Sequence, residues 1–143
     1  MNINPIDPNE LKIGYELPEY VVEISAQKYR KYNRLIKEIN PIHISKKYAQ
    51  RAGYDTIIVA GNYLFTFIPK WLVDWIADVN PIKNITINFV NPVYPDDKLI
   101  HQGKINEIEE LDGSKILKCE YTVKKSNNEI TASGEIILSF KLP

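Results

Sequence analysis

The feature that most constrains the fold is a change of hydrophobic period near residue 83. Before it, residues 62–78 are apolar nearly all round a helical wheel, which predicts a helix buried on most of its sides. Pro69 lies inside this segment and predicts a kink or a break into two pieces. After residue 83 the period becomes two, since Ile85, Ile87 and Phe89 alternate with polar residues.

Three further segments with strand character follow, at 98–109, 115–124 and 130–142. Asp112-Gly113 and Asn127-Asn128 stand between them and predict hairpin turns. A mostly helical first half followed by a meander predicts an α+β fold, in which an antiparallel β-sheet wraps around one central α-helix.

The first third of the chain predicts a short strand and a helix that ends at a turn. Residues 1–18 are rich in Pro, Asn and Asp and predict an irregular lead-in, and residues 20–24 predict a short strand. Ser25 is an N-cap for a helix over residues 26–39. Pro41 stops this helix, which places Glu38 in its last turn and His43 just beyond the break. A second short helix is expected over residues 46–52.

Composition excludes several classes of function. Eighteen basic residues balance eighteen acidic ones, and no run of Lys or Arg forms a basic helix, so nucleic-acid binding is disfavoured. Charged residues interrupt the longest apolar segment, which argues against a membrane span. The single cysteine, Cys119, is expected to be inert and, with no signal peptide at the start, points to a cytoplasmic location. The length favours one domain spanning residues 1–143.

Glu38 and His43 are the residues most suited to chemistry. They lie five positions apart across Asn40-Pro41, a rigid turn that can hold an acid/base pair. Hydration of a 2-enoyl thioester needs such a pair for its two proton transfers, and donors for the charge on the thioester oxygen. The helix start at Gly61-Asn62 offers unpaired backbone N–H groups for that purpose.

Four elements in order carry a family resemblance. They are the stretch from Glu38 to His43, Gly53-Tyr54, Ala60-Gly61, and the loop Pro92-Val93-Tyr94-Pro95-Asp96-Asp97. This pattern resembles the MaoC-type enoyl-CoA hydratases. In that family an Asp usually stands at the position of Glu38, and glycines usually stand at the positions of Lys37 and Asp96.

The resemblance implies a hotdog fold and an (R)-specific 2-enoyl-thioester hydratase, or equivalently a 3-hydroxyacyl-thioester dehydratase, in fatty-acid metabolism. Glu38 and His43 would be its catalytic residues, Asn40 would fix the loop, and Gly61 would supply the oxyanion donor beside Asn62. No metal and no redox cofactor is implied, because CoA or phosphopantetheine arrives with the substrate. A homodimer, or a heterodimer with a hotdog paralogue, is expected, with a groove between subunits rather than a basic patch.

Other interpretations stay open on the sequence alone. Glu38, Lys37 and Ala60 depart from the family pattern and favour a non-catalytic hotdog subunit that binds acyl chains beside an active paralogue. A hotdog thioesterase would need a carboxylate on the central helix, where Asp74 and Asp78 lie far from Gly61. Several candidate residues also have plain structural interpretations: Gly61 permits close packing, Asn62 caps a helix, and the aromatic cluster around Trp71 and Trp75 forms core or interface. His101 is given no catalytic role.

Overall fold

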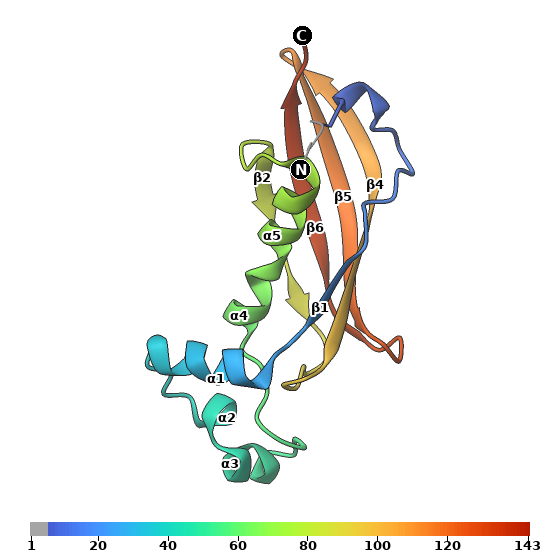
Figure 1. Cartoon of the computed structure of the whole chain (residues 1–143). Coiled ribbons are helices and arrows are strands. Elements are labelled where there is room, and N and C mark those ends of the chain that lie inside the picture. The colour runs from blue at the N-terminus through green and yellow to red at the C-terminus, as the bar shows by residue number, and fades with distance from the viewer. Residues whose placement is uncertain (1–5) are drawn as a thin grey trace.

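The computed structural model describes residues 6–143, and the first five residues of the expected lead-in lie outside this range. The helices are the 3-10 turn η1 (Pro8–Glu10), α1 (Ala26–Leu35), α2 (Pro41–Ile44), α3 (Lys46–Arg51), α4 (Gly61–Phe65) and α5 (Phe67–Ile76). The strands are β1 (Tyr20–Glu23), β2 (Ile82–Ile85), β3 (Asn88–Phe89), β4 (Lys98–Leu111), β5 (Ser114–Lys125) and β6 (Ile130–Lys141). Helices α1 to α3 gather at one end of the molecule, below the long strands in Figure 1.

The strands form one antiparallel sheet in the order β1-β4-β5-β6-β2, and β3 also pairs with β6. Strands β4, β5 and β6 make the predicted meander, joined by turns in which Asp112, Gly113 and Asn128 have positive φ. The sheet curves around α4 and α5, which lie against its inner face (Figure 1). The prediction of an antiparallel sheet wrapped around a central helix is confirmed.

Helix α5 supplies much of the core. Its buried residues face inward-pointing residues of β4, β5 and β6, and they are Ile68, Trp71, Leu72 and Ile76. Trp71 is 2% exposed and donates its indole N–H to the carbonyl of Pro18 at 2.7 Å, which ties the lead-in to the helix. Of the two expected roles for the aromatic cluster, core packing therefore holds for Trp71.

The central helix breaks where a proline requires it. Helix α4 ends at Phe65, Thr66 forms the turn, and Pro69 lies in the first turn of α5. A proline is tolerated there because the first N–H groups of a helix have no partner within it, whereas in a continuous helix its ring would clash with the carbonyl of Phe65. The predicted break is confirmed, three residues before the proline itself.

Helix α1 is shorter than predicted, which corrects the position of Glu38. The helix ends at Leu35, and Lys37 adopts the left-handed conformation at φ +54°. The N–H of Glu38 donates to the carbonyl of Asn33 at 2.9 Å, and that of Lys37 donates to Arg34 at 3.3 Å, which together form a Schellman motif. Glu38 thus lies beyond the helix and not in its last turn.

The predicted strand over residues 83–89 is two strands with a gap at Thr86 and Ile87. The carbonyl of Thr86 accepts a hydrogen bond from the Tyr121 hydroxyl at 2.6 Å. It lies against Gly134, where a Cβ atom would approach the Thr86 oxygen to 2.0 Å. The edge of the sheet therefore bends inward where Gly134 leaves room for it.

His101, which was given no catalytic role, is a core residue of β4. It is 1% exposed, it packs between the rings of Tyr20 and Trp71, and its Nδ1 lies 3.0 Å from the carbonyl of Tyr20. Burial lowers the pKa of His101 below its ordinary value of 6.5, and the hydrogen bond to Tyr20 only partly opposes this.

We expect the stability of the protein to fall as pH drops below about 6.5. In this range the unfolded chain protonates His101 while the folded chain does not, so each pH unit removes at most about 1.4 kcal/mol from the free energy of unfolding. Urea denaturation of the wild type and of His101→Gln, between about pH 7.5 and 5, measures the difference. A parallel pH dependence in the two proteins would contradict the assignment, because carboxylates titrate alike in both.

Candidate active site

His43 lies on the short helix α2, whose position follows from the residues before it. Asn40 is the N-cap of α2, and its side-chain oxygen accepts a hydrogen bond from the N–H of Ile42 at 3.2 Å. Pro41 occupies the first helical position, where its fixed φ suits the helix and its missing N–H costs nothing. Cap and proline together start a new helix directly after α1 and set the direction of His43.

His43 lines a pocket of about 310 Å³ between α2, α4 and the edge strand β3. The Gly61 end of α4 lies on the same pocket, so the structure brings these two candidate residues together. Most of the remaining lining is apolar, as an acyl chain would require, and includes Tyr54, Ile58, Leu64, Phe89, Val90 and Val93.

A hydrogen bond fixes the tautomer of His43. Its Nδ1 lies 2.9 Å from the backbone carbonyl of Ile58. Because a carbonyl oxygen can only accept, Nδ1 carries the proton of the neutral imidazole, which leaves Nε2 with a lone pair. The ring is therefore held ready to take a proton at Nε2.

Two polar residues on the buried face of α1 hold the neighbouring backbone, Tyr29 at the segment of Ile58 and Asn33 at α2. The Tyr29 hydroxyl donates to the carbonyl of Ile58 at 3.1 Å and accepts from the N–H of Ala60 at 2.8 Å. The Asn33 amide donates to the carbonyl of His43 at 3.2 Å. Burial raises the pKa of Tyr29, so its hydroxyl remains a donor at neutral pH.

The start of α4 offers the expected donors. Within residues 6–143, the N–H groups of Gly61 and Asn62 have no hydrogen-bond acceptor, whereas that of Ala60 is taken by Tyr29. The side chain of Asn62 accepts from the N–H of Tyr63 at 2.9 Å and does not line the pocket. A Cβ atom at Gly61 would approach the Phe89 ring to 2.7 Å, so the glycine also permits close packing.

Glu38 does not line the pocket. Its Oε1 turns back to its own loop and accepts from the N–H groups of Ile39 at 3.0 Å and Asn40 at 2.9 Å. Its negative charge still acts near the site, since it adds to the rise in the pKa of Tyr29 that burial causes. The structure therefore places Glu38 beside the network of His43, with its carboxylate facing the loop.

The two family positions that usually hold glycine keep a backbone typical of glycine. Lys37 has φ +54° and Asp96 has φ +71°. The Asp96 carboxylate accepts from the N–H of Ala26 at 3.2 Å, and Asp97 accepts from the N–H of Tyr94 at 2.8 Å. Asp96 and Asp97 are turn residues, and Asp96 attaches this loop to the start of α1.

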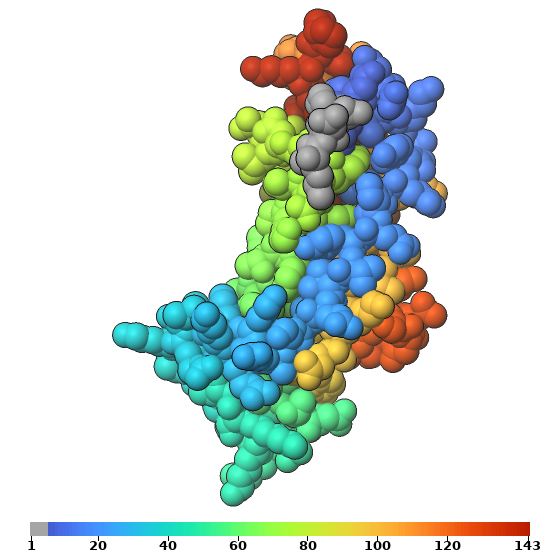
Figure 2. All heavy atoms as spheres, in the orientation of Figure 1, coloured from blue at the N-terminus to red at the C-terminus, as the bar shows by residue number. Residues whose placement is uncertain are grey.

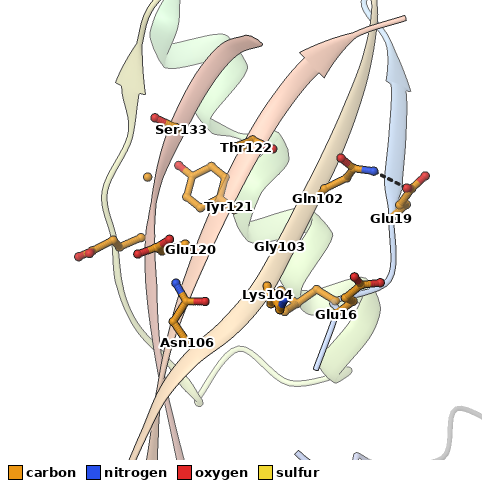
Figure 3. A pocket seen from close by; sticks show the side chains of 13 residues that line it. Glu16, Glu19, Gln102, Gly103, Lys104, Asn106, Glu120, Tyr121, Thr122 and Ser133 are labelled. Carbon is orange, nitrogen blue, oxygen red and sulfur yellow. Dashed lines mark hydrogen bonds between the residues drawn. The ribbon is translucent and has the colours of Figure 1, made fainter. Parts of the chain in front are cut away.

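A larger hollow of about 570 Å³ lies on the outer face of the sheet, with α5 on the far side of the strands (Figure 3). Four carboxylates border it against one lysine, Lys104, and they belong to Glu16, Glu19, Glu120 and Glu135. Tyr121 reaches it, but burial raises the pKa of that hydroxyl to about 12 and its proton is donated to Thr86. An acidic surface repels a phosphate-bearing thioester, so the pocket of His43 is the better candidate.

Residues 6–143 form neither a cluster of metal ligands nor a reactive cysteine. No group of three or more His, Cys, Asp or Glu side chains is placed to hold a metal ion there. Cys119 is fully buried in β5, and burial raises the pKa of its thiol to about 12, which agrees with the expectation that it is inert. Of the same residues, no helix is long and apolar enough to span a membrane.

Tyr29 and Asn33 were not expected to serve the site. Both are the buried residues of α1, and the available signal was the amide of Asn33, because a buried amide needs partners. Phe89 was expected only as a strand residue. Its contact with Gly61 joins segments 28 positions apart, which no local pattern indicates.

Comparison with known proteins places the chain in a family. The model of the MaoC like domain matches residues 12–128. The chain is 28% identical over 113 residues to the fatty acid synthase beta subunit TOXC of Cochliobolus carbonum. The matched segment covers 78% of this chain and 5% of the relative. It is 23% identical over 104 residues to the mitochondrial 3-hydroxyacyl-[acyl-carrier-protein] dehydratase FERN of Solanum lycopersicum, covering 73% of this chain and 62% of that protein.

Solved structures agree on the fold. An (R)-hydratase from A. caviae involved in PHA biosynthesis has a TM-score of 0.76 at 18% identity, covering 94% of this chain and 98% of that one. A chain of the HadBC (3R-hydroxyacyl-ACP dehydratase) complex from Mycobacterium tuberculosis has a TM-score of 0.68 at 18% identity, covering 90% and 96%. The chain adopts the hotdog fold and belongs to the MaoC-like domain family.

Proposed function

We propose that the protein interconverts 2-enoyl thioesters and (R)-3-hydroxyacyl thioesters of CoA or acyl carrier protein. The observation that carries the proposal is the pocket that His43 and Gly61 line together with mostly apolar residues, where Nδ1 of His43 is bonded to Ile58 and the N–H of Gly61 has no acceptor within residues 6–143. Family membership and the names of several relatives support it.

In the dehydration direction the residues divide the work in a simple way. The Nε2 of His43 takes the proton from Cα, and the N–H of Gly61 stabilises the negative charge that develops on the thioester oxygen. The side chain of Glu38 faces its own loop in the structure, so this step requires it to turn into the pocket in its protonated form. There its carboxyl group gives a proton to the hydroxyl leaving Cβ, so that water departs and the double bond forms. Hydration is the reverse, and neither direction requires a metal or a redox cofactor.

The first test is turnover by the purified chain. We expect loss of the conjugated enoyl-thioester absorbance with crotonyl-CoA and longer 2-enoyl-CoAs, and chiral analysis is expected to identify the (R)-3-hydroxyacyl product. A folded protein that turns over no chain length would contradict the proposal for the isolated chain. Activity that emerges only with a hotdog paralogue would instead support the non-catalytic interpretation.

The variant Glu38→Gln distinguishes a role of Glu38 in proton transfer from a purely structural role in its loop. Glutamine keeps a side-chain oxygen that can accept from the N–H groups of Ile39 and Asn40, but it cannot transfer a proton. We expect kcat to fall about 100-fold or more with little change in Tm. Glu38→Asp is the matched control, since it keeps the acid and should retain activity within about tenfold. Full activity in the glutamine variant would show that Glu38 only caps its loop.

A further inference from the structure

The balanced net charge of the chain hides a local imbalance. Residues 26–53, the basic segment hereafter, contain eight of the eighteen Lys and Arg residues and one acidic residue, Glu38. Their formal charge is therefore +7, from eight minus one, and the remaining residues carry −7, from ten minus seventeen. The expectation that no basic patch forms is wrong, because α1, α2 and α3 fold together into one projecting unit (Figure 2).

All eight of these side chains are exposed, and none forms an ion pair with a carboxylate within residues 6–143. Four lie on α1, namely Lys28, Arg30, Lys31 and Arg34. Arg30 and Arg34 are four positions apart, a spacing at which like charges destabilise a helix, and α1 contains no acidic residue to offset them. An ordinary solvated helix carries both signs of charge, so this surface is suited to an anionic partner.

Large apolar side chains are exposed among these charges. Five of the twelve exposed large hydrophobic residues in the described part of the chain fall in the basic segment: Leu35, Ile36, Ile39, Ile44 and Tyr48. Leu35 is 72% exposed and lies one helical turn from Lys31, and Ile39 is 88% exposed. Apolar residues within a polar rim are typical of a protein interface, whereas a single nucleotide needs far less apolar surface.

We propose that the basic segment docks the acidic face of a protein that carries the acyl thioester. This inference rests on the proposed function and specifies what carries the acyl group. The substrate arrives on an acidic carrier protein rather than on CoA. His43 lies on α2 within the same unit, so a carrier docked there presents its thioester arm at the pocket. Charge attraction then raises the rate of encounter, and the apolar residues form the contact.

Other occupants suit the surface less well. A second copy related by a two-fold axis would bring one +7 surface against another, which is repulsive. An anionic membrane would favour a helix with one exposed apolar face. Here the basic and the apolar residues are mixed over α1, the loop at Lys37, and α3.

The test uses one acyl group on three thiols. Crotonyl is presented on a phosphopantetheinylated acyl carrier protein, on CoA, and on N-acetylcysteamine, which bears no charge. The variant Lys28→Glu/Lys31→Glu reverses two exposed charges in the first two turns of α1, and the one at Lys28 lies in the first turn, where an acidic residue suits the helix dipole. The control Lys12→Glu/Lys141→Glu makes the same change in net charge. Its two residues belong to the N-terminal segment and the end of β6, which lie at the opposite end of the molecule (Figure 1).

We expect kcat/KM on the carrier-protein substrate to fall about 10- to 100-fold in the α1 variant and to change little in the control. On CoA and N-acetylcysteamine thioesters the α1 variant should stay close to the wild type. Added salt should weaken the wild-type reaction on the carrier protein much more than that on N-acetylcysteamine. An equal loss on CoA and carrier protein, or a loss on all three substrates, would overturn the proposal.

Binding is measured separately from turnover, so that the two proposals can fail independently. Fluorescence anisotropy of the labelled carrier protein reports docking even if no thioester is turned over. Saturable binding lost only in the α1 variant supports the docking surface. No binding, or preferential binding to anionic phospholipid vesicles, to duplex DNA or to a second copy of the chain, would overturn it.

Discussion

Replacing His43 with alanine is expected to lower kcat/KM for 2-enoyl thioesters by about a thousandfold. The substitution removes the imidazole whose Nδ1 is bonded to the carbonyl of Ile58 and whose Nε2 is proposed to take the proton from Cα. The N–H groups of Gly61 and Asn62 remain, so substrate binding should weaken much less than the chemical step. Steady-state kinetics with crotonyl-CoA would show this as a loss in kcat more than a rise in KM.

The same variant should fold almost as well as the wild type. His43 contributes one side-chain hydrogen bond, and its acceptor, the carbonyl of Ile58, keeps the bond from the Tyr29 hydroxyl. A loss of about 1 kcal/mol in the free energy of unfolding is expected. His101→Gln is the matched control, because it changes the second of the two histidines without touching the pocket, and its activity at neutral pH should be normal. Undiminished turnover in His43→Ala would exclude the proposed role.

Much of the fold could be predicted because its elements depend on local patterns. The alternation in β4 to β6, the turns at Asp112-Gly113 and Asn128, and the break near Pro69 all follow from residues close in sequence. The Asn40 cap and Pro41 likewise determine where α2 begins. These elements place His43 and the start of α4 in one pocket, as the family resemblance implied.

The residue at which α1 ends could not be predicted from the local pattern. The helical spacing continues through Ile36 and Ile39, yet the chain leaves the helix at Lys37, a residue that rarely adopts positive φ. Ile39 is 88% exposed, so its apolar character does not report burial. The direction of the Glu38 side chain depends on this turn, which explains why the sequence predicted the residue but not the orientation of its carboxylate.

The network behind His43 and the shape of the sheet edge depend on distant residues. Tyr29 meets Ile58 and Ala60 across some thirty positions, and Thr86 meets Tyr121 and Gly134 across still more. A single sequence gives no direct sign of such pairs. The same holds for the charge of the basic segment, which becomes a surface only when three helices fold together.

Gly134→Ala is expected to be the most destabilising small substitution in the sheet. Its Cβ atom would lie 2.0 Å from the Thr86 oxygen and 2.9 Å from the Tyr121 hydroxyl. The nearer of these two atoms is the backbone oxygen of Thr86. Thr86 cannot move away easily, because its N–H donates to the carbonyl of Glu135 in β6 at 2.9 Å. A loss of about 3 kcal/mol follows, which corresponds to roughly 10 °C in Tm for a chain of this size.

Gly103 supplies the matched control. It lies in the same cross-strand row, opposite Tyr121, but a Cβ atom there would meet the Trp71 side chain at 3.0 Å and no backbone atom closer than 3.4 Å. Gly103→Ala should therefore cost about 1 kcal/mol. Thermal unfolding followed by circular dichroism compares the two, and equal shifts in Tm would mean that the Thr86 carbonyl yields easily.

The double variant Gly134→Ala/Tyr121→Phe tests which contact is responsible. Removing the Tyr121 hydroxyl relieves the contact at 2.9 Å but leaves the one with the Thr86 oxygen, so the stability of Gly134→Ala should not recover. The displaced Thr86 also lies three residues before Phe89, whose ring covers Gly61 at the pocket. Folded Gly134→Ala should thus show a raised KM for 2-enoyl thioesters, and an unchanged KM would indicate that β3 keeps its place when the bend at Thr86 is strained.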